Sequence, residues 1–166
     1  MKFNKPVGSF VVLTRKNRGE VFLVKRSDFP VWEPQGGGME KGETPETTAM
    51  REAYEETGFK VKILRKVAEY KNPKTNKITS HVFEGKYISG IFKPEYHGCE
   101  GKWFDINNLP SQMTATRKMM IKDCLENSNK LIRRQEIPAV STQNLHLLFL
   151  LPIESFRYVL KFIFRS

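Results

Sequence analysis

A helix with well-marked ends, lying between strand-like segments, constrains the fold of this chain more than any other feature. Thr44-Pro45 is typical of a helix start, because a Thr side chain caps the first turn and Pro fits the first helical position. Gly58 suits the end of such a helix. Ala49 and Ala53 give the helix a face of small residues. The helix can therefore pack closely on a sheet.

Apolar, β-branched segments on both sides of the helix predict that sheet. The predicted strands cover residues 7–14, 21–25, 59–69, 78–88 and 102–104. The glycine-rich residues 33–43 and the basic residues 71–77 are expected to form loops. Residues 112–125 are expected to form a second helix, whose Met119, Met120 and Ile121 belong to the core. Strands before, between and after helices predict a layered α/β or α+β domain.

Composition and charge limit the class of protein. The 166 residues, 39% of them hydrophobic, are enough for one domain with a core, and no apolar run is long enough to span a membrane. The two cysteines, Cys99 and Cys124, form neither a disulfide framework nor a zinc site, so a cytoplasmic location is expected. The net charge of +10 favours nucleotides, nucleic acid or an anionic membrane surface as partners, although a solvated basic face is an equal alternative.

Three carboxylates share one face of the predicted helix. Glu52, Glu55 and Glu56 stand at i, i+3 and i+4, and Arg51 cannot neutralise all of them. Solvation of surface carboxylates is one interpretation. The glycine-rich loop before the helix favours a second one, a hard divalent cation such as Mg²⁺, which takes oxygen ligands and keeps substrate phosphates in its shell.

The glycine-rich loop is a candidate to contact the substrate. Gly36, Gly37 and Gly38 allow backbone conformations that are closed to other residues, so their amides can approach an anion and their carbonyls a metal ion. Glu43, at the end of the loop, could bond Arg51 and fix its orientation.

The segment from Gly37 to Phe59 resembles the complete sequence box of the Nudix (MutT-like) hydrolases. After Gly37 come five residues, then Glu43, then seven residues, then Arg51-Glu52-Ala53-Tyr54-Glu55-Glu56-Thr57-Gly58-Phe59. All seven fixed Gly, Glu and Arg positions match. A looser resemblance extends from about residue 7 to residue 125, with Gln35 where many members have Pro.

This resemblance implies a Nudix-type α/β/α sandwich around a mixed β-sheet, which we expect over residues 1–137. It also implies Mg²⁺-dependent hydrolysis of a phosphoanhydride in a nucleoside diphosphate linked to another moiety, with Mn²⁺ as a substitute ion. Glu52, Glu55 and Glu56 would be metal ligands, and the Gly37 carbonyl a further one.

The resemblance also suggests roles for other residues. Arg51 and Glu43 would orient the reacting groups rather than react themselves. Glu55 is a candidate to accept the proton of the attacking water. The family often takes that residue from a later loop, where Glu100 is our first candidate and Glu95 the second. Both could equally be surface charges.

Several residues outside the box could contact the substrate. Arg26, directly after a predicted strand, is the candidate phosphate contact. Trp32 and Tyr70 could stack on a nucleobase, although an aromatic residue at the edge of a core is the commoner case. His97 is interpreted as a loop histidine.

Two questions stay open. Residues 138–166 form an apolar and basic extension that could pack on the domain or a second subunit of a homodimer, lie on a membrane surface, or form a tail. The alternative function is a Nudix-fold regulator that binds nucleotides or RNA without turnover, which the positive charge keeps open. The substrate could be a nucleoside triphosphate, ADP-ribose, a dinucleoside polyphosphate, a sugar nucleotide or capped RNA.

Overall fold

A mixed β-sheet lies at the centre of the protein in the computed structural model, which describes residues 6–27, 31–94, 98–126, 130–138, 141–144 and 147. The strands are β1 (Gly8–Arg15), β2 (Glu20–Lys25), β3 (Trp32–Glu33), β4 (Gln35–Gly38), β5 (Lys60–Lys71), β6 (Ile78–Ser89), β7 (Glu100–Asp105) and β8 (Ile132–Gln135). Their order is β3-β2-β1-β6-β5-β8, with β4 paired to β1 and β7 to β2. The β1–β6 and β5–β8 pairs are parallel and the others antiparallel, so the expected mixed sheet is confirmed.

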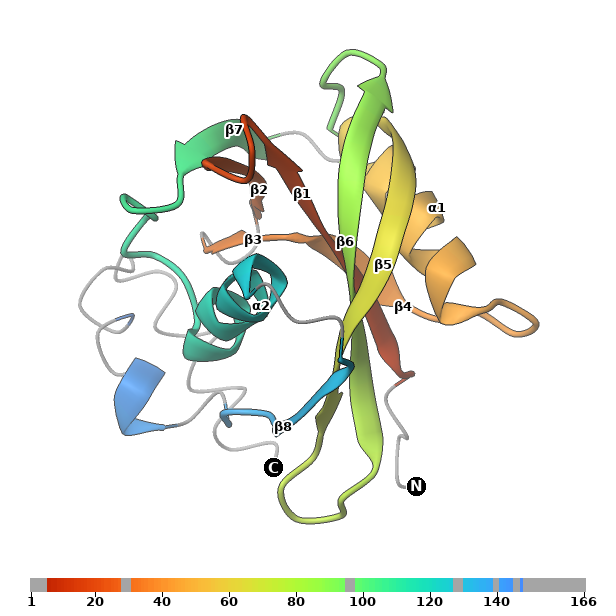
Figure 1. Ribbon diagram of the computed structural model, residues 1–166, viewed down its shortest axis with the longest axis vertical. Coiled ribbons are helices and arrows are strands. Elements are labelled where there is room, and N and C mark those ends of the chain that lie inside the picture. The colour runs from red at the N-terminus through yellow and green to blue at the C-terminus, as the bar shows by residue number, and fades with distance from the viewer. Residues whose placement is uncertain are drawn as a thin grey trace.

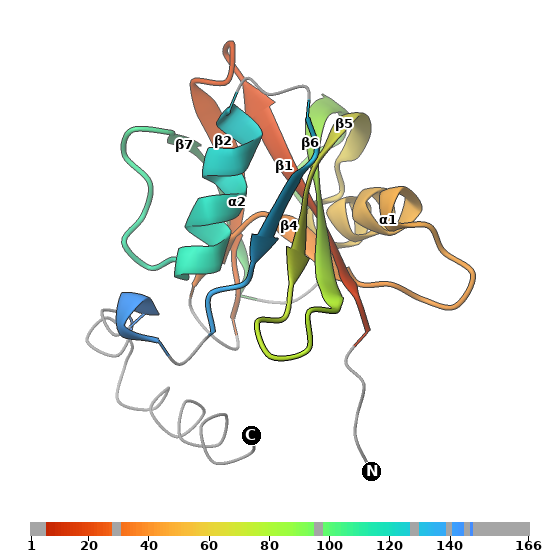
Figure 2. The ribbon, with the colours of Figure 1, turned by 60° about the horizontal axis from the view of Figure 1, so that its bottom comes forward.

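Two helices cover opposite faces of this sheet, as Figures 1 and 2 show. They are α1 (Pro45–Thr57) and α2 (Ala115–Leu125). The alternation of side chains along β1 explains both layers. Phe10 and Val12 pack in the cluster beneath α2, whereas Val11 and Leu13 pack in the cluster beneath α1. The chain therefore has the expected α/β/α arrangement.

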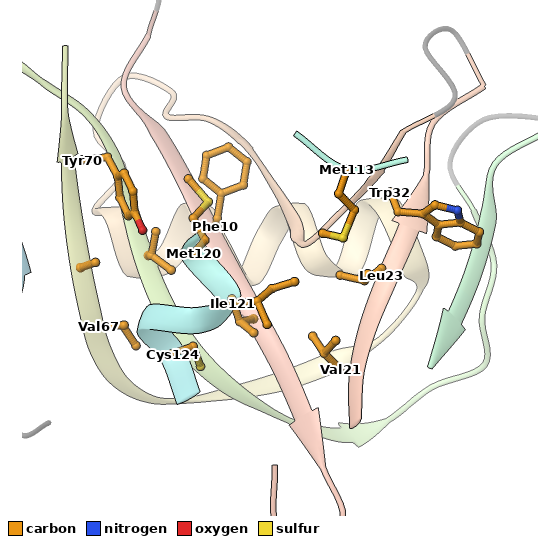
Figure 3. Close-up of a cluster of buried hydrophobic side chains, with 13 residues drawn as sticks. Phe10, Val21, Leu23, Trp32, Val67, Tyr70, Met113, Met120, Ile121 and Cys124 are labelled. Carbon is orange, nitrogen blue, oxygen red and sulfur yellow. The ribbon is translucent and has the colours of Figure 1, made fainter. Parts of the chain in front are cut away.

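The cluster on the α2 side is the larger of the two (Figure 3). Met120, Ile121 and Cys124 of α2 lie over Phe10 and Val21 of the first two strands, and all five are buried. Burial of apolar surface at roughly 25 cal/mol per Å² makes such a cluster the main stabilising contribution. The prediction that Met120 and Ile121 belong to the core is confirmed, whereas Met119 is only partly buried and packs against this cluster.

The ends of α1 are as the sequence predicts. The Thr44 side chain accepts a hydrogen bond from the Thr47 amide at 3.2 Å, and the Thr44 amide donates to the Thr47 hydroxyl at 3.0 Å. Gly58 has φ 73° and its amide donates to the Tyr54 carbonyl at 2.7 Å. These local contacts fix where the helix begins and ends.

Several boundaries differ from the prediction, and two of the differences have a clear physical reason. Residues 35–38 of the expected glycine-rich loop form β4, where Gly36 pairs with Phe10 and a Cβ on Gly36 would lie 2.3 Å from the Ser9 carbonyl oxygen. Glycine is thus required by the close approach of two strands, although it is normally depleted in strands. Helix α2 begins three residues later than expected, because Thr114 caps it by accepting from the Arg117 amide at 3.3 Å.

Only part of the 138–166 extension belongs to the described residues. Asn144 is buried, accepts from the Ala115 amide at 2.7 Å and donates to the Pro138 carbonyl at 3.1 Å, and Leu147 is buried as well. The expectations for residues 148–166 lie outside the described residues. Within the described ranges, no helix has the length and apolar character needed to cross a membrane.

Candidate active site

The glycine strand β4 contacts helix α1, and Figure 2 shows how both elements are placed at the sheet. The Gly36 amide donates to Glu56 Oε2 at 3.0 Å. A Cβ added to Gly37 would lie 2.4 Å from Glu52 Cδ, so the Glu52 carboxylate occupies the space that the missing side chain leaves. The structure therefore brings the glycine segment and two of the predicted carboxylates together.

Arg51 connects the rest of the site. Its Nε donates to Glu43 Oε1 at 2.7 Å and its Nη2 to Glu43 Oε2 at 3.1 Å. Its Nη1 donates to Glu52 at 2.8 Å and to Glu55 at 2.7 Å, and its Nη2 also reaches the Gly38 carbonyl at 3.1 Å. One guanidinium thus neutralises part of the charge of the helix face, and Glu43 holds it in the orientation suggested by the sequence.

Glu43 is fixed in its charged form. Hydrogen bonds from Arg51, the Glu40 amide and the Thr48 hydroxyl lower the pKa of Glu43 to about 2. The same contact with Glu43 is the largest cause that raises the pKa of Arg51 above its usual value. The pair therefore stays ionised throughout the physiological range.

Glu56 has the opposite environment. Burial, followed by the charges of Glu33 and Glu52, raises the pKa of Glu56 to about 8, while the Gly36 amide and the Arg26 charge act against this rise. Without a bound cation, this carboxyl group is mostly protonated at neutral pH.

Glu33, in β3, is a site residue that the sequence did not single out. It accepts from Arg117 Nε of α2 at 3.1 Å and pairs with Arg26 Nη1 at 3.5 Å. Arg117 is 84 positions further along the chain, so only the fold reveals the contact. The candidate phosphate contact Arg26 is thereby placed beside Glu33 and close enough to Glu56 to affect its pKa.

The other candidates lie apart from this cluster or outside the described residues. Glu100 begins β7, is 61% exposed in its side chain and pairs with Lys25 Nζ at 3.0 Å. Among the described residues, its carboxylate is thus bonded to a lysine of the neighbouring strand. Glu95 and His97 lie outside the described residues.

Trp32 and Tyr70 are core residues. Trp32 is 8% exposed and packs edge-on against Phe104, with a centroid distance of 4.7 Å. The Tyr70 side chain is fully buried and its hydroxyl donates to Asp123, while burial raises the pKa of that hydroxyl. The structure therefore supports the core interpretation of both residues rather than stacking on a base.

The side chains offer oxygen ligands for a hard cation, but they do not converge in this conformation. Among the described residues, no group of three His, Cys, Asp or Glu side chains is arranged to hold a metal ion. The reason is visible in the contacts: Arg51 lies between Glu52 and Glu55, and Glu56 turns toward Gly36. The all-carboxylate donor set, with the Glu52 carboxylate packed directly against Gly37, nevertheless fits Mg²⁺ or Mn²⁺ chemically.

Comparison with known proteins decides the family. The sequence profile described as "NUDIX domain" matches residues 5–124. The chain belongs to the Nudix family. This Nudix chain is 34% identical over 117 residues to a Bacillus subtilis (strain 168) protein provisionally named 8-oxo-dGTP diphosphatase, covering 70% of this chain and 77% of that protein.

Other comparisons agree with the assignment. An RNA pyrophosphohydrolase of Roseobacter denitrificans is 36% identical over 95 residues, 56% of each chain. The crystal structure of a Nudix hydrolase from Nitrosomonas europaea superposes with a TM-score of 0.65 at 23% identity, covering 82% of each chain, and thus shows the same fold. This chain is accordingly a Nudix hydrolase, a pyrophosphohydrolase that acts on phosphorus anhydrides.

Proposed function

We propose that this Nudix hydrolase cleaves a phosphoanhydride bond in a nucleoside diphosphate linked to another moiety, and that it requires Mg²⁺. The observation that carries the proposal is the contact between β4 and α1, in which Gly36 and Gly37 meet the carboxylates of Glu56 and Glu52. A phosphate-binding backbone and a cation-binding helix face are thereby adjacent.

Glu52, Glu55 and Glu56 would hold the ion, with the Gly37 carbonyl as a further ligand and Mn²⁺ as a substitute ion. When bound, the cation would neutralise phosphate charge and make a water molecule more acidic. Arg51 would have to release Glu52 and Glu55, and its bonds to Glu43 would retain it beside the site. Arg51 and Glu43 are therefore positioning residues in this proposal.

The residues proposed to contact the substrate come from β4, from α1 and from the ends of β2 and β7. The amides of Gly36, Gly37 and Gly38 and the guanidinium of Arg26 would contact the phosphates. Glu55, which is 43% exposed in its side chain, is our candidate to accept the proton of the attacking water, and Glu100 is the alternative. Positioning and electrostatic stabilisation carry most of such a reaction.

The names of the relatives, which include an 8-oxo-dGTP diphosphatase, an RNA pyrophosphohydrolase and an ADP-ribose pyrophosphatase, support a nucleotide-type substrate. We further propose a cytoplasmic location for residues 1–137, because both cysteines in the described part are free thiols. A homodimer formed through residues 138–166 is also a proposal, and the mass in solution of a chain lacking that extension tests it.

Comparing Glu55→Gln with Glu100→Gln tests the proton acceptor. If Glu55 has the role, Glu55→Gln removes hydrolysis and Glu100→Gln retains most of it. Because Glu55 is also a proposed ligand, the Mg²⁺ affinity of Glu55→Gln is measured as well, and an unchanged affinity assigns the loss to the proton acceptor. The reverse result would assign the role to Glu100. Tight nucleotide binding without turnover by the unaltered protein would instead favour a regulator.

A further inference from the structure

An open pocket of about 1140 Å³ lies at the end of β1 that is remote from β4. Its walls come from the turn between β1 and β2, from the last part of β6 and from Trp103 of β7. Phe59, directly after the Gly58 cap of α1, also lines it. None of the residues assigned to the hydrolytic site above belongs to this lining.

The rim of the pocket is cationic. The basic side chains among the described residues that line it are Arg15, Lys16, Arg18 and Lys86. Arg15 and Lys16 pair with Glu20, and Arg18 donates to the buried Glu84 at 2.7 Å. Glu84 also accepts from Arg65 at 2.7 Å, so the cationic groups exceed the carboxylates that they contact. The excess of positive charge suits an anionic ligand.

The floor of the pocket is aromatic and apolar. Phe59 packs edge-on against Tyr87 at a centroid distance of 5.0 Å, and the Arg15 guanidinium lies 4.1 Å from the ring centroid of Trp103. Leu64 and Ile91, which also line the pocket, are 52% and 87% exposed. Phe59 itself is only 6% exposed, so the flat surface beside the charged rim comes from the partly exposed rings of Tyr87 and Trp103. A base that stacks on Trp103 would take the place of the Arg15 guanidinium.

The turn that carries two of the cations has an unusual backbone. Lys16, Asn17 and Arg18 have φ values of 49°, 53° and 68°, a left-handed region that costs free energy for residues with long side chains. Glycine would fit these positions with less strain. The turn nevertheless keeps two long cationic side chains at the rim.

We propose that this pocket binds a nucleotide unit of a single-stranded nucleic acid chain. A base would stack on the aromatic floor while the neighbouring phosphates meet Arg15, Lys16 and Lys86, the combination by which single strands are commonly bound. A membrane surface fits less well, because the aromatic side chains line a pocket and only two of its described lining residues, Leu64 and Ile91, are exposed large apolar side chains. The inference does not depend on the proposed function, since binding requires no turnover.

Binding of labelled oligouridine, measured by fluorescence anisotropy in EDTA, tests the charged rim. The double variant Lys16→Glu/Lys86→Glu should lose roughly tenfold or more in affinity and show a weaker salt dependence. Lys74→Glu/Lys77→Glu makes the same charge change in the 71–77 loop, where both residues are exposed, and should change affinity by less than about twofold. Equal loss in both variants, or no loss in the first, would overturn the proposal. Thermal melting confirms that each variant is folded.

Tryptophan fluorescence tests the aromatic floor. The chain has two tryptophans, so Trp32→Phe leaves Trp103 as the only reporter. Saturating oligouridine should quench it, whereas polyphosphate, which has no bases, should not. In Trp103→Phe, where only the buried Trp32 remains, oligouridine should leave the emission unchanged. Unchanged Trp103 emission, or tighter binding to phosphatidylglycerol vesicles than to oligouridine, would contradict the proposal.

Discussion

At the scale of single residues, Arg51 occupies the carboxylate face that we propose as the metal site. Its guanidinium touches Glu52 and Glu55 and is itself held by Glu43 and the Gly38 carbonyl. A guanidinium brings one charge, whereas a divalent ion brings two and tolerates closer oxygen ligands. The carboxylate face that Arg51 only partly neutralises is therefore suited to exchange this contact for a cation.

Glu55→Gln should reduce the rate of hydrolysis by roughly 100-fold or more, because the amide can neither accept the water proton nor serve as a charged ligand. The fold should be unaffected, since the Glu55 side chain is 43% exposed. Steady-state kinetics and circular dichroism measure the two effects. Glu46→Gln, exposed in the first turn of the same helix, is the matched control. Full activity of folded Glu55→Gln would refute the assignment.

Gly37→Ala should weaken Mg²⁺ binding by about tenfold while leaving the melting temperature nearly unchanged. The added Cβ meets only the end of the flexible Glu52 side chain, which would have to move away from β4. Gly36→Ala, by contrast, meets the Ser9 carbonyl and the Phe10 backbone and should lower the melting temperature. Calorimetric Mg²⁺ titration and thermal melting separate the two effects. Unaltered Mg²⁺ affinity in Gly37→Ala would show that Glu52 is not a ligand.

At the scale of elements, what the sequence predicts correctly is what short-range contacts determine. The limits of α1 follow from Thr44 and Gly58, which lie within the helix or next to it. The strand β4 depends on pairing with β1, and β8 is a short polar strand that forms only against β5. Glu33 is bonded to Arg117, which lies in a different element far along the chain. No local sequence pattern predicts such a contact.

The packing of α1 on β4 predicts a pH dependence of stability. Without a bound cation, as in EDTA, the pKa of Glu56 is about 8 in the folded chain, whereas an ordinary Glu, as in the unfolded chain, has a pKa of 4.5. The folded state therefore binds more protons between these values, and the free energy of unfolding should fall as pH rises from about 4.5 to 8. One group that titrates in this way changes the free energy of unfolding by about 1.4 kcal/mol per pH unit, so the total fall between pH 4.5 and 8 is of the order of a few kcal/mol.

Urea unfolding at both ends of this pH range measures this change. Glu56→Gln should flatten the pH dependence and be the more stable chain at pH 8, because glutamine carries no charge to bury. An identical pH profile in the two chains would show that Glu56 is not the group responsible.

Helix α2 is tied to the sheet by a buried polar cluster. Tyr70 of β5 donates to Asp123, which also accepts from Arg134 Nε of β8 at 2.8 Å. Tyr70→Phe should lower the free energy of unfolding by about 1–2 kcal/mol, because Asp123 loses one donor but keeps Arg134. Chemical denaturation measures the loss. A change below about 0.3 kcal/mol would mean that the bond contributes nothing net.

At the scale of the whole molecule, the two ends of β1 have different roles. One end pairs with the glycine strand of the hydrolytic site, and the other carries the cationic turn of the pocket. The sequence predicted the carboxylate helix, the sheet and the positive charge, because each is recorded in local residue patterns. It did not predict the pocket, because the β1–β2 turn, β6 and β7 meet only in the folded chain.

Product analysis tests the central claim most directly. The purified chain is incubated with Mg²⁺ and a panel of nucleoside triphosphates, diphosphate-linked nucleotides and 5′-triphosphorylated RNA, and the product masses are read. We expect cleavage at a phosphoanhydride bond of at least one compound, lost in EDTA and in Glu55→Gln. Tight binding without product from any compound would contradict a hydrolase and favour a nucleotide-binding regulator.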